Sequence, residues 1–344
     1  DGFSEVEGAQ QTANHLNINV QNKLVSHEMI DALPRIVAAY DEPFADPSIL
    51  PTYFICSFAR EYATVCVSGD GGDESFAGYP TYIADSINRV TGFLPAWLSQ
   101  SISQLFELYG PVRHRKVGWD EKARRFFAAN HMPQNQAHGG WRMIFSENEK
   151  AKLIRDSYID KKHRTPFEEI ASFSEDVREC DYLDQAIYMD IKTWLVDDIL
   201  VKIDRASMHH SLEIRSPLLD HRIVEFAATL PRAMKLKWFS GKRLLRRLAA
   251  KRLPEKIIKR PKQGFSAPVS SWLMQPLADM GQDITMSSDL SAIVNKKYVE
   301  GLWHEHLYKK RDHGLKLFGL VCLGLWLENA KALHTKRLVS MGAS

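Results

Sequence analysis

The chain has 344 residues, of which 44% are hydrophobic and 25% are charged, and its formal net charge is +3. This composition is typical of a soluble globular protein with one large or two smaller domains, and the chain is long enough to bury a sizeable core. The charge is too small to indicate a class of partner, which excludes an assignment from charge alone.

The sequence carries no signs of secretion, zinc binding or membrane insertion. Its cysteines lie among apolar neighbours without a C-x-x-C spacing, which predicts reduced, buried thiols in a cytoplasmic protein and no obvious zinc site. The first residues lack the basic and apolar regions of a signal peptide. The longest apolar run, 315–327, contains Lys316 and is too short to span a bilayer, so we expect a buried helix there. The cysteines are Cys56, Cys66, Cys180 and Cys322.

The first ninety residues predict alternating helices and strands, and the rest of the chain predicts mainly helices. The early order favours a parallel, doubly wound sheet, with Ser48 as a possible cap of a following helix. The expected early elements are helices at 5–17, 27–40 and 52–61, and strands at 18–20 and 64–67. The expected later helices are 85–110, 118–130, 147–155, 179–212, 220–229, 241–252 and 315–334.

A glycine-rich, acidic loop follows the strand at 64–67. It reads Ser68-Gly69-Asp70-Gly71-Gly72-Asp73-Glu74, and its glycines let the backbone take positive φ and let a ligand approach closely. Ligands of open α/β sheets bind at the carboxyl ends of strands, where this loop lies. Its carboxylates would repel a polyphosphate unless a divalent cation lay between them. The loop therefore predicts a metal-assisted nucleotide site, with a solvated turn as the alternative.

A lysine in a second loop is a candidate phosphate ligand. Lys262 lies between Pro261 and Gly264, directly after the basic segment 235–260. Most charges of that segment predict the solvated face of an amphipathic helix. A lysine held in a constrained loop can instead stabilise a phosphate that gains charge during a reaction.

The charges between 198 and 220 leave two interpretations open. Asp198 and Lys202 have the i,i+4 spacing of a helical ion pair, so they are either scaffolding or part of a site. Glu213, Arg215 and Asp220 predict a buried ion-pair cluster rather than catalytic groups.

Several motifs, in order over about residues 1–335, together resemble the synthetase domain of glutamine-dependent asparagine synthetases. Each of them alone is a weak signal. They are Asp41-Glu42-Pro43-Phe44-Ala45-Asp46-Pro47, Ser68 to Glu74 with Phe76-Ala77-Gly78-Tyr79, Lys202-x-Asp204-Arg205 with Ser207-Met208, Glu213-x-Arg215-Ser216-Pro217, and Lys262-Gln263-Gly264-Phe265.

The resemblance implies an adenine nucleotide alpha hydrolase-like (PP-loop) α/β fold and a ligase. It implies that ATP adenylates the side-chain carboxylate of aspartate and that ammonia then displaces AMP to give asparagine. In this interpretation residues 1–90 belong to the nucleotide-binding α/β unit, and 91–344 form the mainly helical part of the same domain. The implied roles are ATP binding for Ser68, Gly69, Gly71 and Gly72, acyl-adenylate formation for Asp70, Mg²⁺ binding for Asp73, and stabilisation of the α-phosphate for Lys262.

The chain departs from the family's pattern in two respects. The S-G-G-x-D-S motif of the family's pyrophosphate-binding loop does not occur, and neither does a glutaminase domain with its N-terminal cysteine. We therefore expect a C-terminal portion of a longer protein that cannot hydrolyse glutamine, binds ATP poorly or not at all, and is inactive on its own. We also expect unpaired backbone and exposed apolar surface beside the sheet, and a glutaminase domain of the parent chain as partner; a homodimer stays open.

Three alternatives stay open on the sequence alone. The acceptor could be another carboxylate, such as a sugar acid or a peptide side chain. The protein could be a tRNA-modifying adenylating enzyme that docks RNA on 235–260, although leucines rather than aromatic residues interleave the charges there. It could also be a non-catalytic scaffold, which the presence of Asp70, Asp73 and Lys262 disfavours.

Overall fold

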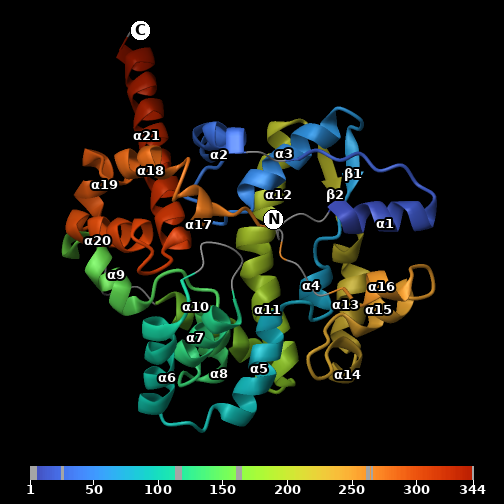
Figure 1. Ribbon diagram of the computed structural model, residues 1–344. Helices are drawn as coiled ribbons and strands as arrows, with labels where there is room; N and C mark the ends of the chain where they lie inside the picture. The colour runs from blue at the N-terminus through green and yellow to red at the C-terminus, as the bar shows by residue number, and fades with distance from the viewer. Residues whose placement is uncertain are drawn as a thin grey trace.

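The computed structural model describes residues 6–24, 27–112, 118–159, 165–260, 264 and 266–342. Most of them are helical, and the two strands lie side by side near α3 and α1 (Figure 1). Segments of 3-10 and π-helix carry the label η. The elements up to the first strand are α1 (Val6–Leu16), η1 (His27–Ala32), α2 (Leu33–Ala38), α3 (Ile49–Arg60) and β1 (Val65–Val67).

The elements between the two strands are helical. They are α4 (Gly72–Ser75), α5 (Pro80–Thr91), α6 (Ala96–Tyr109), α7 (Trp119–Ala129), α8 (Gln134–Gly140), α9 (Glu147–Leu153), η2 (Asp156–Tyr158), α10 (Pro166–Ser172), η3 (Phe173–Val177), α11 (Tyr182–Lys192), η4 (Trp194–Leu200) and α12 (Val201–His209).

The last elements begin with the second strand. They are β2 (Glu213–Arg215), η5 (Pro217–Leu219), α13 (His221–Thr229), α14 (Arg232–Lys235), α15 (Arg243–Ala249), α16 (Glu255–Ile258), α17 (Val269–Trp272), α18 (Ala278–Thr285), α19 (Ser288–Ile293), α20 (Lys296–Leu307) and α21 (Gly314–Gly342).

The two strands pair in parallel, with Cys66 opposite Ile214. The pairing continues past β1, because the Ser68 N–H donates to the Arg215 carbonyl at 2.9 Å. The predicted strand at 64–67 and the parallel direction are thus confirmed. The larger doubly wound sheet is not seen among the described residues, where the sheet has these two strands. The strand β2 was not predicted, since three residues with two charges give little strand signal.

One side of this small sheet packs on the protein and the other is exposed. Cys66 and Ile214 pack against a small core of Cys56, Ala206 and Leu212. Val65 and Val67 point the other way and are 42% and 73% exposed. The expected exposed apolar surface beside the sheet is confirmed.

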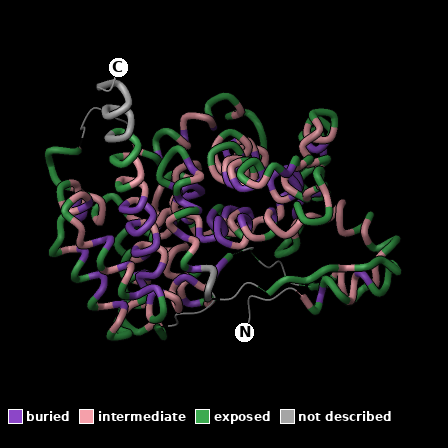
Figure 2. Tube along the Cα trace, turned by 90° about the horizontal axis from the view of Figure 1, so that it is seen from above, coloured by how far each residue is buried: buried purple, intermediate pink, exposed green. Residues whose placement is uncertain are grey.

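The largest core surrounds α21, the long helix that rises above the rest of the chain in Figure 1. Leu317, Phe318 and Val321 are fully buried there, together with Leu33 and Ile36 of α2. Figure 2 shows that buried stretches run through the interior of the molecule and that exposed residues lie around them. The predicted helix at 315–334 and the predicted burial of 315–327 are confirmed, and the helix continues to Gly342. Among the described helices, none has the length and apolar character needed to cross a membrane.

Some predicted elements differ from the structure. Residues 18–20 form no strand, and the helix expected at 27–40 is a 3-10 segment followed by α2. The helix expected at 85–110 divides around Gly92 to Pro95 into α5 and α6. The helix expected at 179–212 is interrupted at Thr193, where φ is −124° and ψ is −76°. Sequence reasoning missed α8, α10, α14 and α16–α20.

The predicted cap and the predicted charge cluster are also different. Ser48 precedes α3, but its side chain donates to Asp46 instead of capping the helix. The expected buried cluster of Glu213, Arg215 and Asp220 is wrong. Glu213 pairs with Arg215 at 2.7 Å at the surface, whereas Asp220 pairs separately with Arg222. These short local pairs need no burial because water solvates both partners.

The cysteine prediction is correct in part. Cys56 and Cys322 are buried free thiols, and Cys66 is half-buried. Cys180 is exposed, so the prediction of burial is wrong there. It lies in the turn before α11, between the charged residues Glu179 and Asp181.

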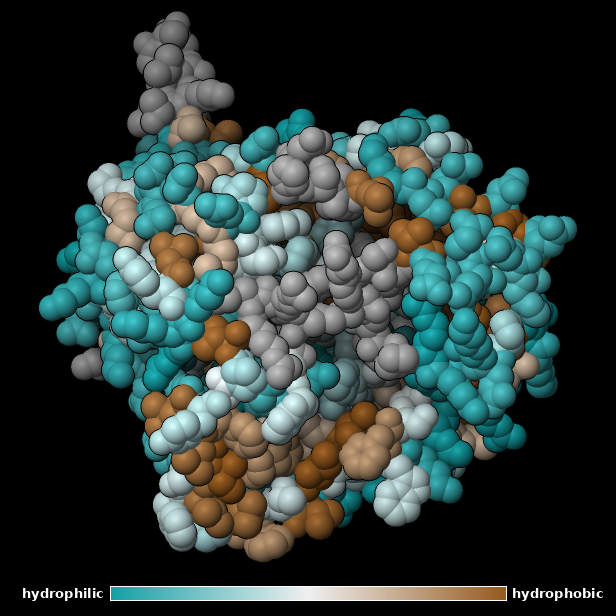
Figure 3. Space-filling view, in the orientation of Figure 1, coloured by the Kyte–Doolittle hydropathy of each residue, from teal (hydrophilic) through white to brown (hydrophobic). Residues whose placement is uncertain are grey.

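Apolar side chains also gather on one outer face, over α6 and its neighbours (Figure 3). Phe93, Trp97, Tyr109 and Trp119 are each more than two-thirds exposed there. Exposed aromatic residues at this density are unusual for a surface that faces only water.

The packing around α21 predicts how two substitutions on this helix change the free energy of unfolding. Leu317→Ala should destabilise the protein by about 2–5 kcal/mol, because it leaves a cavity in a packed core. Leu333→Ala on the same helix is the matched control, since that side chain is 68% exposed. It should change the free energy of unfolding by less than about 0.5 kcal/mol. Urea unfolding measures both, and equal effects of the two substitutions would contradict this description of the core.

Candidate functional site

The acidic loop turns sharply after β1 and leads into the short helix α4. Gly71 lies at the turn with φ of +84°, and a Cβ there would lie 2.2 Å from Leu219 Cδ2. Glycine is therefore required at this position for both conformation and space. Above Gly69, by contrast, a Cβ would meet nothing within 4 Å. The backbone of Gly69 is thus open to close approach by a ligand.

Ser68 fixes the start of the loop to the second strand. Its hydroxyl lies 2.8 Å from the Ser216 hydroxyl, in addition to the backbone bond to Arg215. Ser68 and Ser216 are 148 residues apart in sequence. The loop is therefore held by a long-range contact and not only by its own turn.

Asp73 pairs with a lysine that sequence reasoning missed. Lys242 Nζ lies 3.0 Å from Asp73 Oδ1, and the Lys242 backbone N–H donates to the Phe76 carbonyl at 2.9 Å. Gly78 makes room for this pair, because a Cβ there would lie 1.9 Å from Asp73 Oδ1. Lys242 belongs to the basic segment that predicted a solvated face, and nothing in the local sequence distinguishes it from its neighbours.

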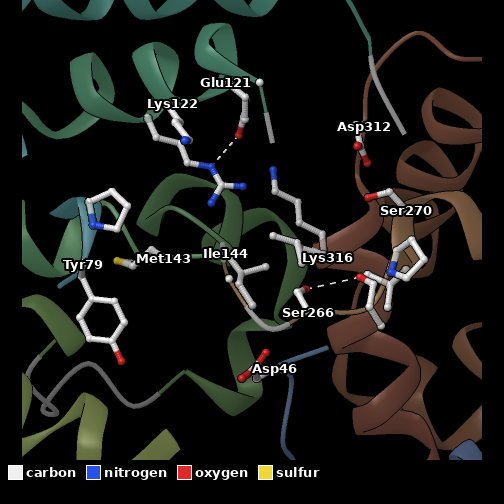
Figure 4. Close-up of a pocket in the computed structure, with 18 of the residues that line it drawn as sticks. Asp46, Tyr79, Glu121, Lys122, Met143, Ile144, Ser266, Ser270, Asp312 and Lys316 are labelled. Carbon is white, nitrogen blue, oxygen red and sulfur yellow. Dashed lines mark hydrogen bonds and ion pairs between the residues drawn. The ribbon is translucent and has the colours of Figure 1, made fainter. Parts of the chain in front are cut away.

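A cavity of about 900 Å³ opens over this loop. Ser68, Gly69, Asp70, Gly71 and Asp73 line it, as do residues 266–270 and parts of α6, α7 and α21. In Figure 4, Tyr79 and Asp312 lie on opposite sides of the cavity, with Asp46 and Ser266 between them.

Most of the predicted site residues thus share one cavity, and two need separate mention. Gly72 is buried, and its Cα faces Leu218, whose Cδ1 would lie 2.9 Å from a Cβ. Its predicted role in ATP binding stays a prediction. Lys262 lies outside the described residues. Its sequence neighbours Gly264 and Ser266 line the same cavity as Asp70 and Asp73.

A second charged group forms the floor of the cavity. Lys202 Nζ lies 2.7 Å from Asp46 Oδ2 and 3.5 Å from Asp198 Oδ1. Burial, followed by the nearby Asp46 carboxylate, raises the pKa of Asp198 to about 7. Burial also acts to raise the pKa of Asp46, but Lys202 and Ser48 outweigh it and lower that pKa below its usual value. Lys202 therefore does more than pair with Asp198 along one helix face. Its second bond, to Asp46, joins α12 to the loop that carries Asp46.

Glu74 and Tyr79 form a buried pair beside the loop. Glu74 is 1% exposed, and the Tyr79 hydroxyl donates to its Oε1 at 2.5 Å. Burial raises the pKa of Glu74, and the bond from Tyr79 offsets part of this rise. Both residues line the cavity.

The donor set suits one kind of metal better than another. Within the described residues, no group of three or more His, Cys, Asp or Glu side chains has metal-site geometry. A zinc or calcium cage is therefore not formed by these side chains. Asp70 and Asp73 on one cavity wall fit Mg²⁺, which uses one or two carboxylates together with phosphate oxygens of a substrate.

Comparison with known proteins identifies the family. The asparagine synthase family profile matches residues 1–328. The chain is 31% identical over 331 residues to asparagine synthetase [glutamine-hydrolyzing] 1 of Bacillus subtilis, covering 94% of this chain and 50% of that protein. It is 29% identical over 328 residues to a putative asparagine synthetase of Mycobacterium tuberculosis, covering 95% and 49%.

A more distant relative carries a different name. Amidase chry2 of Gibberella zeae is 22% identical over 331 residues, covering 88% of this chain and 45% of that protein. The chain thus spans about half the length of the curated relatives it matches.

The raised pKa of Asp198 predicts that the stability of the protein depends on pH. Burial raises its pKa to about 7 from the ordinary value of 3.8. Its contribution to stability is therefore complete below pH 4 and is lost as the pH rises through about 7. Asp198→Asn removes this loss, so the variant should gain stability relative to the wild type between pH 4 and 7 and keep the gain above pH 7.

Urea unfolding midpoints at pH 4.5 and pH 8 measure this gain. The exposed neighbour Asp197 provides the control Asp197→Asn, which should show no such dependence. An Asp198→Asn effect of the same size at both pH values would contradict the prediction.

Proposed function

Because this chain belongs to the asparagine synthase family, we propose that its protein amidates a carboxylate at the expense of ATP, converting aspartate to asparagine through an acyl-adenylate. The observation that carries this proposal is the shared cavity. It brings the open backbone of Gly69 together with the carboxylates of Asp70 and Asp73.

ATP is proposed to bind over the loop from Ser68 to Asp73. The absence of a side chain at Gly69 allows phosphate oxygens to approach the backbone, Gly71 lines the same cavity, and the Ser68 hydroxyl adds a further donor. Asp70 lies on the same wall and is assigned to formation of the acyl-adenylate. Gly72 supports the turn from beneath.

Asp73 would hold Mg²⁺ in this proposal, and Asp70 lines the same cavity. The ion supplies charge neutralisation for the phosphates of ATP. The ammonium of Lys242 already neutralises Asp73 in the structure, which lowers the repulsion between this wall and a polyphosphate.

The proposed reaction has two displacements. An oxygen of the aspartate side-chain carboxylate bonds to the α-phosphorus, and pyrophosphate leaves with the electrons of the broken bond. Ammonia then bonds to the acyl carbon, AMP leaves, and the nitrogen loses a proton. Lys262 is proposed to stabilise the charge that develops on the α-phosphate.

The source of ammonia is also part of the proposal. The related synthetases are named as glutamine-hydrolysing, so we infer that a glutaminase domain of the complete protein supplies it. The buried free thiols of Cys56 and Cys322 agree with a reducing, cytoplasmic location.

A different acceptor is the second candidate. The observation that favours it is that a relative named as an amidase matches over 88% of this chain. An RNA acceptor is less favoured, because Lys235 is buried against Asp184 and Lys242 is paired with Asp73. These two lysines of the basic segment are thereby withdrawn from a docking face.

The proposal predicts the effect of removing the Asp73 charge. Asp73→Asn and Asp70→Asn should each lower kcat/KM for pyrophosphate release by about 100-fold or more, since charge-stabilising groups at reacting phosphates have effects of this size. Asp279→Asn, at an exposed position of α18, is the matched control and should leave the rate unchanged.

The assay uses the complete protein with ATP, ammonia and aspartate. Full activity of Asp73→Asn would contradict the proposed ion site. Pyrophosphate release with another carboxylate but not with aspartate would keep the chemistry and change the acceptor.

A further inference from the structure

Arg142 is a largely buried charge outside the glycine-rich, acidic loop 68–74, which is called the nucleotide loop below. It lies in the turn after α8, and its side chain is 14% exposed. Both terminal nitrogens bind the Asp190 carboxylate, Nη1 to Oδ1 at 2.6 Å and Nη2 to Oδ2 at 2.7 Å. Nη2 also donates to Thr81 Oγ1 at 3.1 Å. This bidentate pairing fixes the plane of the guanidinium. A lysine ammonium has no such plane and could not be held in the same way.

The guanidinium also contacts two aromatic rings that line the cavity. Its central carbon lies 4.9 Å from the Tyr79 ring centroid and 4.6 Å from the Trp194 ring centroid. Tyr79 and Trp194 come from different elements, and both face the same cavity. Arg142 therefore links two walls of the site without lining the cavity in its own right.

Asp190 is itself fixed from behind. His138 Nε2 lies 2.9 Å from Asp190 Oδ1, and His138 Nδ1 lies 2.7 Å from Asp85 Oδ2. These three side chains are at most 3% exposed. Burial acts to lower the pKa of His138, but the two carboxylates outweigh it and raise the pKa to about 9, so the ring donates from both nitrogens at neutral pH. The anchor of Arg142 is thus itself held by a buried, charged histidine.

At the other end, Tyr79 is tied to the nucleotide loop twice. Its hydroxyl donates to Glu74, and the backbone N–H of its neighbour Gly78 donates to the Asp73 carbonyl at 2.7 Å. A change in the position of the Tyr79 ring is therefore transmitted through its hydroxyl to Glu74, which is the sequence neighbour of Asp73.

We propose that Arg142 is a positioning residue for the nucleotide loop: it fixes the Tyr79 ring, and Tyr79 in turn holds residues 73–78 in place. The expected loss of activity on substitution of Arg142 rests on the proposed function. The expected increase in hydrogen exchange of the loop does not depend on it. A purely structural ion pair would stabilise the helices around α11 but would have no selective effect on this loop.

The test compares Arg142→Lys with Arg89→Lys in the complete protein. Arg89 also lies over a tyrosine ring, at 4.6 Å from Tyr182, but neither of these two residues lines the cavity. The first readout is hydrogen exchange of backbone amides in residues 73–79, which requires no activity. We expect exchange there to be about tenfold faster in Arg142→Lys and unchanged in Arg89→Lys.

The second readout separates kcat from KM for pyrophosphate release. Misplaced groups around a reacting phosphate lower the rate of the chemical step, so Arg142→Lys should lower kcat about tenfold and change KM for ATP less than threefold. Arg89→Lys should change neither. The wild-type activity tests the proposed function on its own, whereas the exchange rates test Arg142 whether or not the protein is active.

A double-mutant cycle tests whether the effect passes through Tyr79. Tyr79→Phe keeps the ring and removes the bond to Glu74, so its effect on loop exchange should not add to that of Arg142→Lys. If Arg142→Lys fails to fold, Thr81→Val removes one Arg142 bond at nearly constant shape, and its exchange effect, about threefold, takes its place in the cycle. Additive effects, or loop exchange that matches the wild type in these variants, would overturn the proposal.

Discussion

The site depends on the parallel contact between β1 and the segment around β2. Backbone pairing carries the first strand as far as Ser68, whose N–H and hydroxyl are both bonded across to Arg215 and Ser216. The turn at Gly71 then directs the following carboxylates into the cavity. A loop of this composition, free in solution, would sample many conformations, and the cross-strand contact selects one of them.

A common electrostatic arrangement recurs around the cavity. Three acids that line it have a paired partner: Lys202 for Asp46, Lys242 for Asp73, and the Tyr79 hydroxyl for Glu74. Burial would otherwise disfavour the charged form of these carboxylates. The two lysines also join segments that lie far apart in the sequence.

The sequence was sufficient to predict the parts of the molecule that local pattern encodes. The strand at 64–67, its glycine-rich loop and the buried helix from 315 onward follow from periodicity and composition. Lys242 and Arg142 could not be predicted this way, because their importance lies in partners far along the chain. The strand β2 was missed for the same reason: its three residues are extended because β1 lies beside them.

The space at Gly78 has a consequence for how variants of this protein are interpreted. With no side chain at this position, the Asp73 carboxylate and the Lys242 ammonium can meet directly above the backbone. Even a methyl group at position 78 would separate the carboxylate from the ammonium, and water would then solvate each of them. An alanine at position 78 would therefore have the same effect as removing the Asp73–Lys242 ion pair, although no ionisable atom had been changed.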